Sequence, residues 1–245
     1  MTLTALTLAV AIGVVMGLMG GGGSILAVPA LTLLLHFPPK EAVVISLSVV
    51  AIAATAGAIG SFIRGTLPLA AGLVVGLAAT AGALVGGFAG ARLADATQLR
   101  LLGVVMLVAA TLMLWRPAPD APTGQHRRSL PLLIMIGIPL GILTGVVGVG
   151  GGFLIVPALV MIARLPMREA AGASLIVIAM AATSGLAGYL EETPLALSFI
   201  VPFALVAAAG AIAGGYVAHR LPQQRLQQAF AGVLVVLASY VLIRS

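Results

Sequence analysis

Long apolar runs separated by short polar stretches make up almost the whole chain. The first run covers residues 2–35 and is interrupted near its middle by a cluster of glycines. Further runs cover 41–63, 69–91 and 99–114, and prolines or arginines close each of them. Apolar runs of about 20 residues that nearly lack charge predict membrane-spanning helices. A β-barrel would need short strands of alternating polarity, which these runs lack. The pattern therefore predicts an all-α polytopic membrane protein.

The same pattern occurs a second time in the chain. Gly17–Pro29 reads GLMGGGGSILAVP, and Gly145–Pro157 reads GVVGVGGGFLIVP, 128 positions later (157 − 29 = 128). Other residues also match at a shift of 128 positions along most of the chain. A match of this length is not expected by chance. The sequence thus predicts two duplicated halves, residues 1–116 and 129–245, joined by a polar linker at 117–128.

Each glycine cluster is expected to break its helix, because glycine loses the most backbone entropy on ordering and offers no side chain to pack. The arm after the break has only about 12 residues, or roughly 18 Å of helix, which is too short to cross a bilayer alone. If the broken segment crosses once, each half has four crossings and the halves are parallel. If it turns back as a re-entrant hairpin, each half has three further transmembrane helices and the halves are inverted. We favour inverted halves.

Composition and charge support a membrane location. The chain is 61% hydrophobic and only 7% charged, whereas soluble domains carry roughly a quarter charged residues. The net charge of +6 comes from basic residues scattered between the runs, which orient a membrane protein rather than bind nucleic acid. The inverted model gathers most of them on one side, predicted to be the cytoplasmic side of the cell inner (plasma) membrane: Arg64, Arg116, Arg127, Arg128, Arg164, Arg168, Arg220 and Arg225.

The glycine breaks are the first candidates for binding. A helix that restarts in the membrane offers unpaired N–H groups and a partial positive charge, which suit a small anion. Ser24 stands at an N-cap position, where Gly152 stands in the second copy. The alternative, that glycines only allow close helix packing, is the better interpretation of spaced pairs such as Gly13 and Gly17. The predicted substrate contacts are Gly20, Gly21, Gly22, Gly23 and Ser24, with Gly148, Gly150, Gly151, Gly152 and Phe153.

Hydroxyl groups recur at matching places in the runs that follow the breaks. Ser46 matches Ser174, and Thr55 matches Thr183. These side chains would complete an oxyanion site by donating hydrogen bonds. The alternative is that each hydroxyl bonds the preceding helical turn or bridges two helices.

Charged side chains occur only near the ends of the runs. Arg92 and Arg220 follow a Gly-Gly pair and could line an anion entrance, or extend to the lipid headgroups. No Asp, Glu, Lys or Arg lies in the middle of any run, so a side-chain proton relay through the bilayer has no residue to use.

Enzyme chemistry has little support in the sequence. There is no cysteine, and the histidines fall in loops or at run ends. Ser24 as the nucleophile of an intramembrane hydrolase would need a base within hydrogen-bond reach. We therefore predict no enzyme activity, no metal and no cofactor.

The duplicated glycine–proline pattern resembles the TauE/SafE family of sulfite exporters, and the likeness covers nearly the whole chain. It is carried by Gly17, Gly20, Gly22, Gly23 and Pro29, and by Gly145, Gly148, Gly150, Gly151, Gly152 and Pro157. The resemblance implies export of sulfite, a sulfonate or a related small sulfur-containing anion, driven by an ion gradient. The first copy departs from the second at Gly21 (Val149) and Ser24 (Gly152).

Together these features predict a secondary transporter in which two broken helices hold a small oxyanion near the bilayer midplane while the halves rock about it. Its expected partners are the anion, a coupling ion such as H⁺, the lipid bilayer and a second copy of the chain, but not nucleic acid. Two alternatives remain open: a passive anion channel, and a membrane scaffold subunit that transports nothing.

Overall fold

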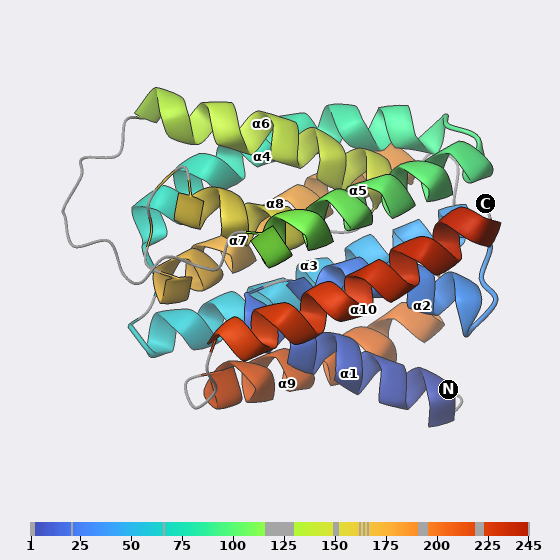
Figure 1. Cartoon of the computed structure of the whole chain (residues 1–245), viewed down its shortest axis with the longest axis horizontal. Coiled ribbons are helices and arrows are strands. Elements are labelled where there is room, and N and C mark those ends of the chain that lie inside the picture. The colour runs from blue at the N-terminus through green and yellow to red at the C-terminus, as the bar shows by residue number, and fades with distance from the viewer. Residues whose placement is uncertain are drawn as a thin grey trace.

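In the computed structural model the chain is built of helices around a buried centre (Figure 1). The structure describes residues 3–20, 22–65, 67–115, 130–148, 152–161, 163, 165, 167–190, 196–218 and 223–244. The elements are α1 Leu3–Met19, η1 Gly22–Leu26 (a 3₁₀-helix), α2 Ala27–Leu33, α3 Pro39–Ile63, α4 Leu69–Ala91, α5 Asp95–Trp115, α6 Leu130–Val147, α7 Gly152–Met161, α8 Met167–Tyr189, α9 Leu197–Ala218 and α10 Gln223–Arg244. These ranges contain no strand, which confirms the all-α class; the predicted linker at 117–128 lies outside them.

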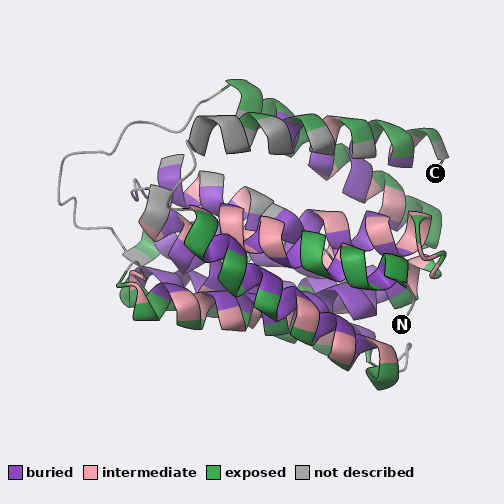
Figure 2. Ribbon diagram, turned by 90° about the horizontal axis from the view of Figure 1, so that it is seen from below, coloured by how far each residue is buried: buried purple, intermediate pink, exposed green. Residues whose placement is uncertain are grey.

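Five of the described helices, α3, α4, α5, α8 and α9, are long and apolar enough to cross a membrane. The outer faces of the bundle carry many large hydrophobic side chains, such as Leu77 and Val85, each 63% exposed. Buried residues line the inside instead (Figure 2). An apolar surface this extensive suits lipid and not water. The protein is therefore a multi-pass membrane protein.

The first broken segment turns back on itself. A Cβ placed on Gly23 would lie 2.5 Å from the backbone N of Met16 and 2.6 Å from the carbonyl O of Ile12, so η1 lies against α1. Further along, Leu33 of α2 lines the same cavity as Leu8 of α1. The segment α1–η1–α2 is therefore a helical hairpin, the shape that the re-entrant alternative predicts.

The second broken segment enters from the opposite end. In Figure 1, α6 begins at the end of the bundle away from the N-terminus, and α8 runs in the direction opposite to α3. This is the arrangement that the inverted alternative predicts. The duplication itself stays a prediction from the sequence.

Each hairpin packs against a helix from the other half. A Cβ on Gly13 of α1 would lie 2.0 Å from the carbonyl O of Ala207 in α9. With the same 128-residue shift, a Cβ on Gly141 of α6 would lie 2.1 Å from the carbonyl O of Ala79 in α4. Backbones in such contact leave no room for any side chain, which confirms the packing role predicted for these spaced glycines.

Candidate functional site

The hairpins turn at two buried glycines with left-handed backbones. Gly20 has φ +64° and Gly148 has φ +71°. Each glycine is pressed against a central helix of the other half. A Cβ on Gly20 would lie 2.4 Å from Cα of Ala171 in α8, and a Cβ on Gly148 would lie 2.3 Å from Cγ1 of Val43 in α3. Any other residue would therefore meet both an unfavourable φ and a clash.

The chain restarts differently after the two breaks. The first copy forms the 3₁₀-helix η1 before α2, whereas α7 begins directly as an α-helix at Gly152. Ser24 consequently lies inside η1 and is fully buried, so its predicted N-cap position is wrong. The glycines ahead of Ser24 allow the tighter 3₁₀ turn to begin two residues earlier. Leu26 precedes α2 and makes no side-chain capping bond.

Two matching serines have different surroundings. Ser174 Oγ donates a hydrogen bond to the carbonyl O of Gly20, and the carbonyl O of Ala171 lies 2.8 Å from the same hydroxyl. Ser46 is 0% exposed and lies one turn after Val43 on α3, on the face that contacts Gly148. Its Oγ has no hydrogen-bond partner among the described residues. A buried polar group left unpaired costs about 1–3 kcal/mol.

Thr55 and Thr183 are not part of this arrangement. Their hydroxyls donate to the carbonyls of Ala51 and Ala179 at 2.7 Å, one turn earlier on the same helix, and both side chains are exposed. Thr55 follows Ser46 by nine residues, which puts it about 14 Å along α3 and on the opposite face. The hydroxyls therefore make the back-bonds of the alternative interpretation, and a contact of these threonines with the substrate stays a prediction.

The structure brings together only part of the predicted site. η1 packs against α7, so Gly23, Ser24 and Gly152 lie near the two turning glycines and the two serines. Arg92 follows the end of α4 and is exposed. Gly21, Gly150, Gly151 and Arg220 lie outside the described residues, and only the backbone of Gly22 and of Phe153 is described.

A buried polar cluster that the sequence did not single out lies beside the second break. Gln98 Nε2 donates to the carbonyl O of Val146 at 2.9 Å and to Tyr189 Oη at 2.7 Å. Tyr189 Oη in turn lies 3.1 Å from the carbonyl O of Gly145. The cluster ties α5 and α8 to the last turn of α6. The sequence signal for this cluster was a glutamine at the start of one apolar run and a tyrosine at the end of another.

Comparison with known proteins places the chain in a family. The model of the sulfite exporter TauE/SafE family matches residues 5–241. The chain belongs to the TauE/SafE family. This confirms the resemblance that the glycine–proline pattern indicates.

Relatives with curated names agree with this TauE/SafE assignment. A "probable membrane transporter protein" of Xylella fastidiosa (strain Temecula1) is 31% identical over 241 residues, covering 96% of this chain and 92% of the relative. The "probable membrane transporter protein YdhB" of Bacillus subtilis is 28% identical, covering 89% and 91%. No solved structure matches. The family and these names indicate a membrane transporter rather than an enzyme.

Proposed function

We propose that this TauE/SafE protein is a secondary transporter that exports a small sulfur-containing oxyanion, such as sulfite or a sulfonate. The anion binds where the two breaks meet. The observation that carries this proposal is Ser46, a fully buried hydroxyl without a described partner on the face that contacts the turning glycine Gly148.

Neutral donors are sufficient to hold the anion. The first N–H groups of α7 have no acceptor within their own helix, and the start of a helix carries a partial positive charge. Ser46 would donate its O–H to one oxygen of the anion. Gly148 has no side chain, so the backbone at the break can approach the other oxygens closely. Coupling to H⁺ is also part of the proposal, and the proton can travel on the anion itself because sulfite is a weak base.

The two serines differ in their hydrogen bonds, and this difference supports alternating access. In this structure Ser174 is engaged with Gly20, while Ser46 is not engaged with a described residue. Inverted repeats provide two such arrangements of similar energy. In the opposite state, Ser46 would bond the Gly148 carbonyl and Ser174 would be released. Because α1 packs on α9 and α6 packs on α4, the bodies that rock would each contain helices from both halves.

Sulfite flux in proteoliposomes, with and without an imposed proton gradient, tests the proposal. Ser46→Ala should raise the KM for sulfite roughly tenfold or more, because a hydrogen bond to a charged group contributes about 1.5–3 kcal/mol. Ser48→Ala is the matched control, since Ser48 lies two residues away and donates to the Val44 carbonyl at 2.8 Å. An unchanged KM in Ser46→Ala would reject the site.

The same assay separates the alternatives. Saturable flux that follows the proton gradient supports a coupled transporter. Flux that ignores the gradient would indicate a channel, and a complete absence of flux for sulfite and for sulfonates would favour a scaffold subunit.

A further inference from the structure

Arg64 occupies an unusual position between two helices. It follows α3 directly, and its guanidinium lies between Gly60 of α3 and Gly215 of α9. A Cβ on Gly60 would lie 3.1 Å from Nη1, and a Cβ on Gly215 would lie 2.8 Å from Nη2. Nη2 donates to Ser61 Oγ at 3.2 Å, and the guanidinium carbon lies 5.2 Å from the ring centroid of Tyr216. The two glycines and the ring thus hold the cation between α3 and α9.

The corresponding place in the other half is closed by backbone contact. The 128-residue shift relates Gly60 to Gly188 and Gly215 to Gly87. A Cβ on Gly188 of α8 would lie 2.4 Å from the backbone N of Phe88 and 2.5 Å from the carbonyl C of Gly87 in α4. The Arg64 guanidinium therefore lies at a place where the corresponding helices, α4 and α8, are in direct backbone contact.

The guanidinium finds only one side-chain acceptor among the described residues, Ser61. Nε and Nη1 are buried and have no hydrogen-bond partner in the part of the chain that the structure describes. Arginine stays protonated, and a charged donor withdrawn from water without a partner is costly. Nε carries one N–H and Nη1 carries two, so three of the five N–H groups have no partner among the described residues. Arginine N–H groups of this kind bind two oxygens of an oxyanion in parallel.

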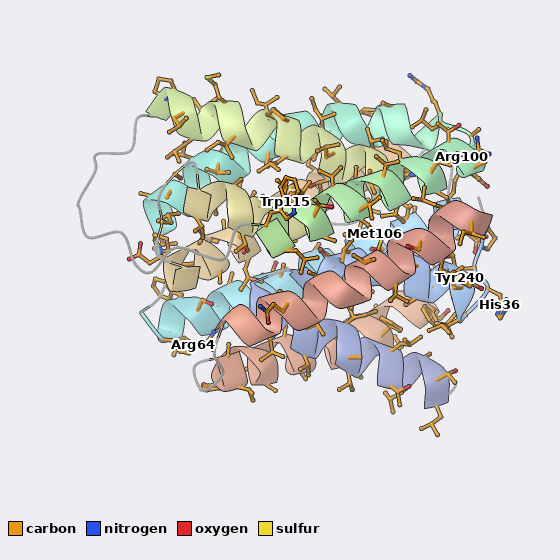
Figure 3. All side chains as sticks on the ribbon, in the orientation of Figure 1. His36, Arg64, Arg100, Met106, Trp115 and Tyr240 are labelled. Atoms are coloured by element: carbon orange, nitrogen blue, oxygen red, sulfur yellow. The ribbon has the colours of Figure 1, made fainter. Side chains whose placement is uncertain are left out.

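Arg64 also lies close to the first break. Gly215, which contacts the guanidinium, lies against Gly17 in the last turn of α1, where a Cβ would be 2.7 Å from the Gly215 N. Figure 3 shows Arg64 at the end of the bundle opposite to Arg100 and His36. This is the end that the distribution of basic residues predicts to be cytoplasmic. The cation therefore stands between the cytoplasmic end and the turn at Gly20.

We propose that Arg64 is a second anion-binding position, which takes a small oxyanion from the cytoplasmic side before the anion reaches the breaks. This inference rests on the proposed function, since the oxyanion at Arg64 is the one transported. A phosphate from a lipid headgroup has the same recognition chemistry, and the experiment separates the two sources.

The test is sulfite flux in proteoliposomes of the full chain, loaded from the face that bears Arg64, for wild type, Arg64→Gln and Arg64→Lys. Arg100→Gln is the control, because Arg100 is exposed and lies at the end of the bundle opposite to Arg64. We expect Arg64→Gln to raise the sulfite KM about tenfold or more, with a maximal rate within about twofold of wild type. Arg64→Lys keeps the charge but loses the planar donor pair, so its KM should lie in between.

Three results would overturn the inference. An unchanged KM in Arg64→Gln, while Ser46→Ala still raises it, removes this position and leaves the proposed function standing. A KM equally raised in Arg100→Gln would indicate a general loss of surface charge. The third is a melting temperature that rises with phosphatidylglycerol in wild type only, together with an unchanged KM in Arg64→Gln, which would assign Arg64 to a lipid headgroup. Absence of flux in wild type and every variant would instead reject the proposed function itself.

Discussion

Two helix crossings are related by the 128-residue shift: α4 with α8, and α3 with α9. They differ in the side chains that lie between the helices. At the first, glycine backbones touch, and Tyr189 joins Gln98 and the end of α6 in a buried cluster. At the second, Ser61 replaces the tyrosine, and the Arg64 guanidinium lies between the helices. The scaffold of small residues is shared, so a few polar side chains make one crossing tight and hold the other apart. If the chain alternates between two states, as proposed above, this difference would favour one of them.

The largest effect is expected at the turns themselves. Gly148→Leu should abolish flux and folding, because it combines a left-handed backbone with a clash against Val43, and each costs about 1–3 kcal/mol. Gly65→Ala is the control, since Gly65 has φ +68° with nothing within 4 Å of a Cβ. Recovery of monodisperse protein by gel filtration, followed by flux, measures both. If Gly148→Leu behaves like Gly65→Ala, the break is not packed as described.

The next effect concerns the tight crossing. Tyr189→Phe should lower the free energy of unfolding by about 1–3 kcal/mol, because it removes the hydroxyl that bonds Gln98 and faces the α6 carbonyls. It should also increase the passive leak of sulfite, if this crossing closes one end of the pathway. Tyr216→Phe is the control, since its ring stays beside Arg64. Thermal unfolding and efflux without a gradient report the two effects, and equal behaviour of both variants would contradict the comparison.

The two serines should respond with different signs. Ser174→Ala should destabilise the protein by about 1 kcal/mol, because the bond to Gly20 is lost. Ser46→Ala should leave stability unchanged or slightly higher, because it removes a buried hydroxyl that lacks a described partner. Chemical or thermal unfolding in detergent measures the difference. Equal destabilisation by the two variants would show that Ser46 is bonded after all.

The smallest effect is expected on the outer surface. Thr55→Val and Thr183→Val should change stability by no more than about 0.5 kcal/mol and leave the sulfite KM as it is, because both hydroxyls bond their own helix. Flux and melting temperature provide the check. A several-fold rise in KM in either variant would place these threonines at the binding site.

Much of the fold could be predicted from the sequence, because in a membrane the helix limits follow hydropathy and proline. The run at 69–91 is α4, and the run at 41–63 differs from α3 only at its start. The run at 99–114 misses the first turn of α5. That turn is polar, but Asp95 suits a helix N-terminus and Gln98 finds partners inside the bundle.

The site was less accessible from the sequence. Matching positions alone put Ser46 and Thr55 in one set, although a helical period of 100° per residue already places them on opposite faces of α3. The position of Arg64 could not be predicted, because it depends on which helix crosses α3 and how closely. Gly60 and Gly215 both contact the Arg64 guanidinium, but they are far apart in the sequence, so the sequence alone does not bring them together.

The interlocking of the hairpins with the opposite halves also bears on how the protein is made. Gly13 packs on Ala207, which is synthesised 194 residues later (207 − 13 = 194), so this contact cannot form before then. At about 5–20 residues per second, this delay amounts to roughly 10–40 seconds. During that time α1 exposes a bare glycine face to lipid or to the insertion machinery. The first half cannot complete its own core, so the bundle closes only when its last helices have entered the membrane.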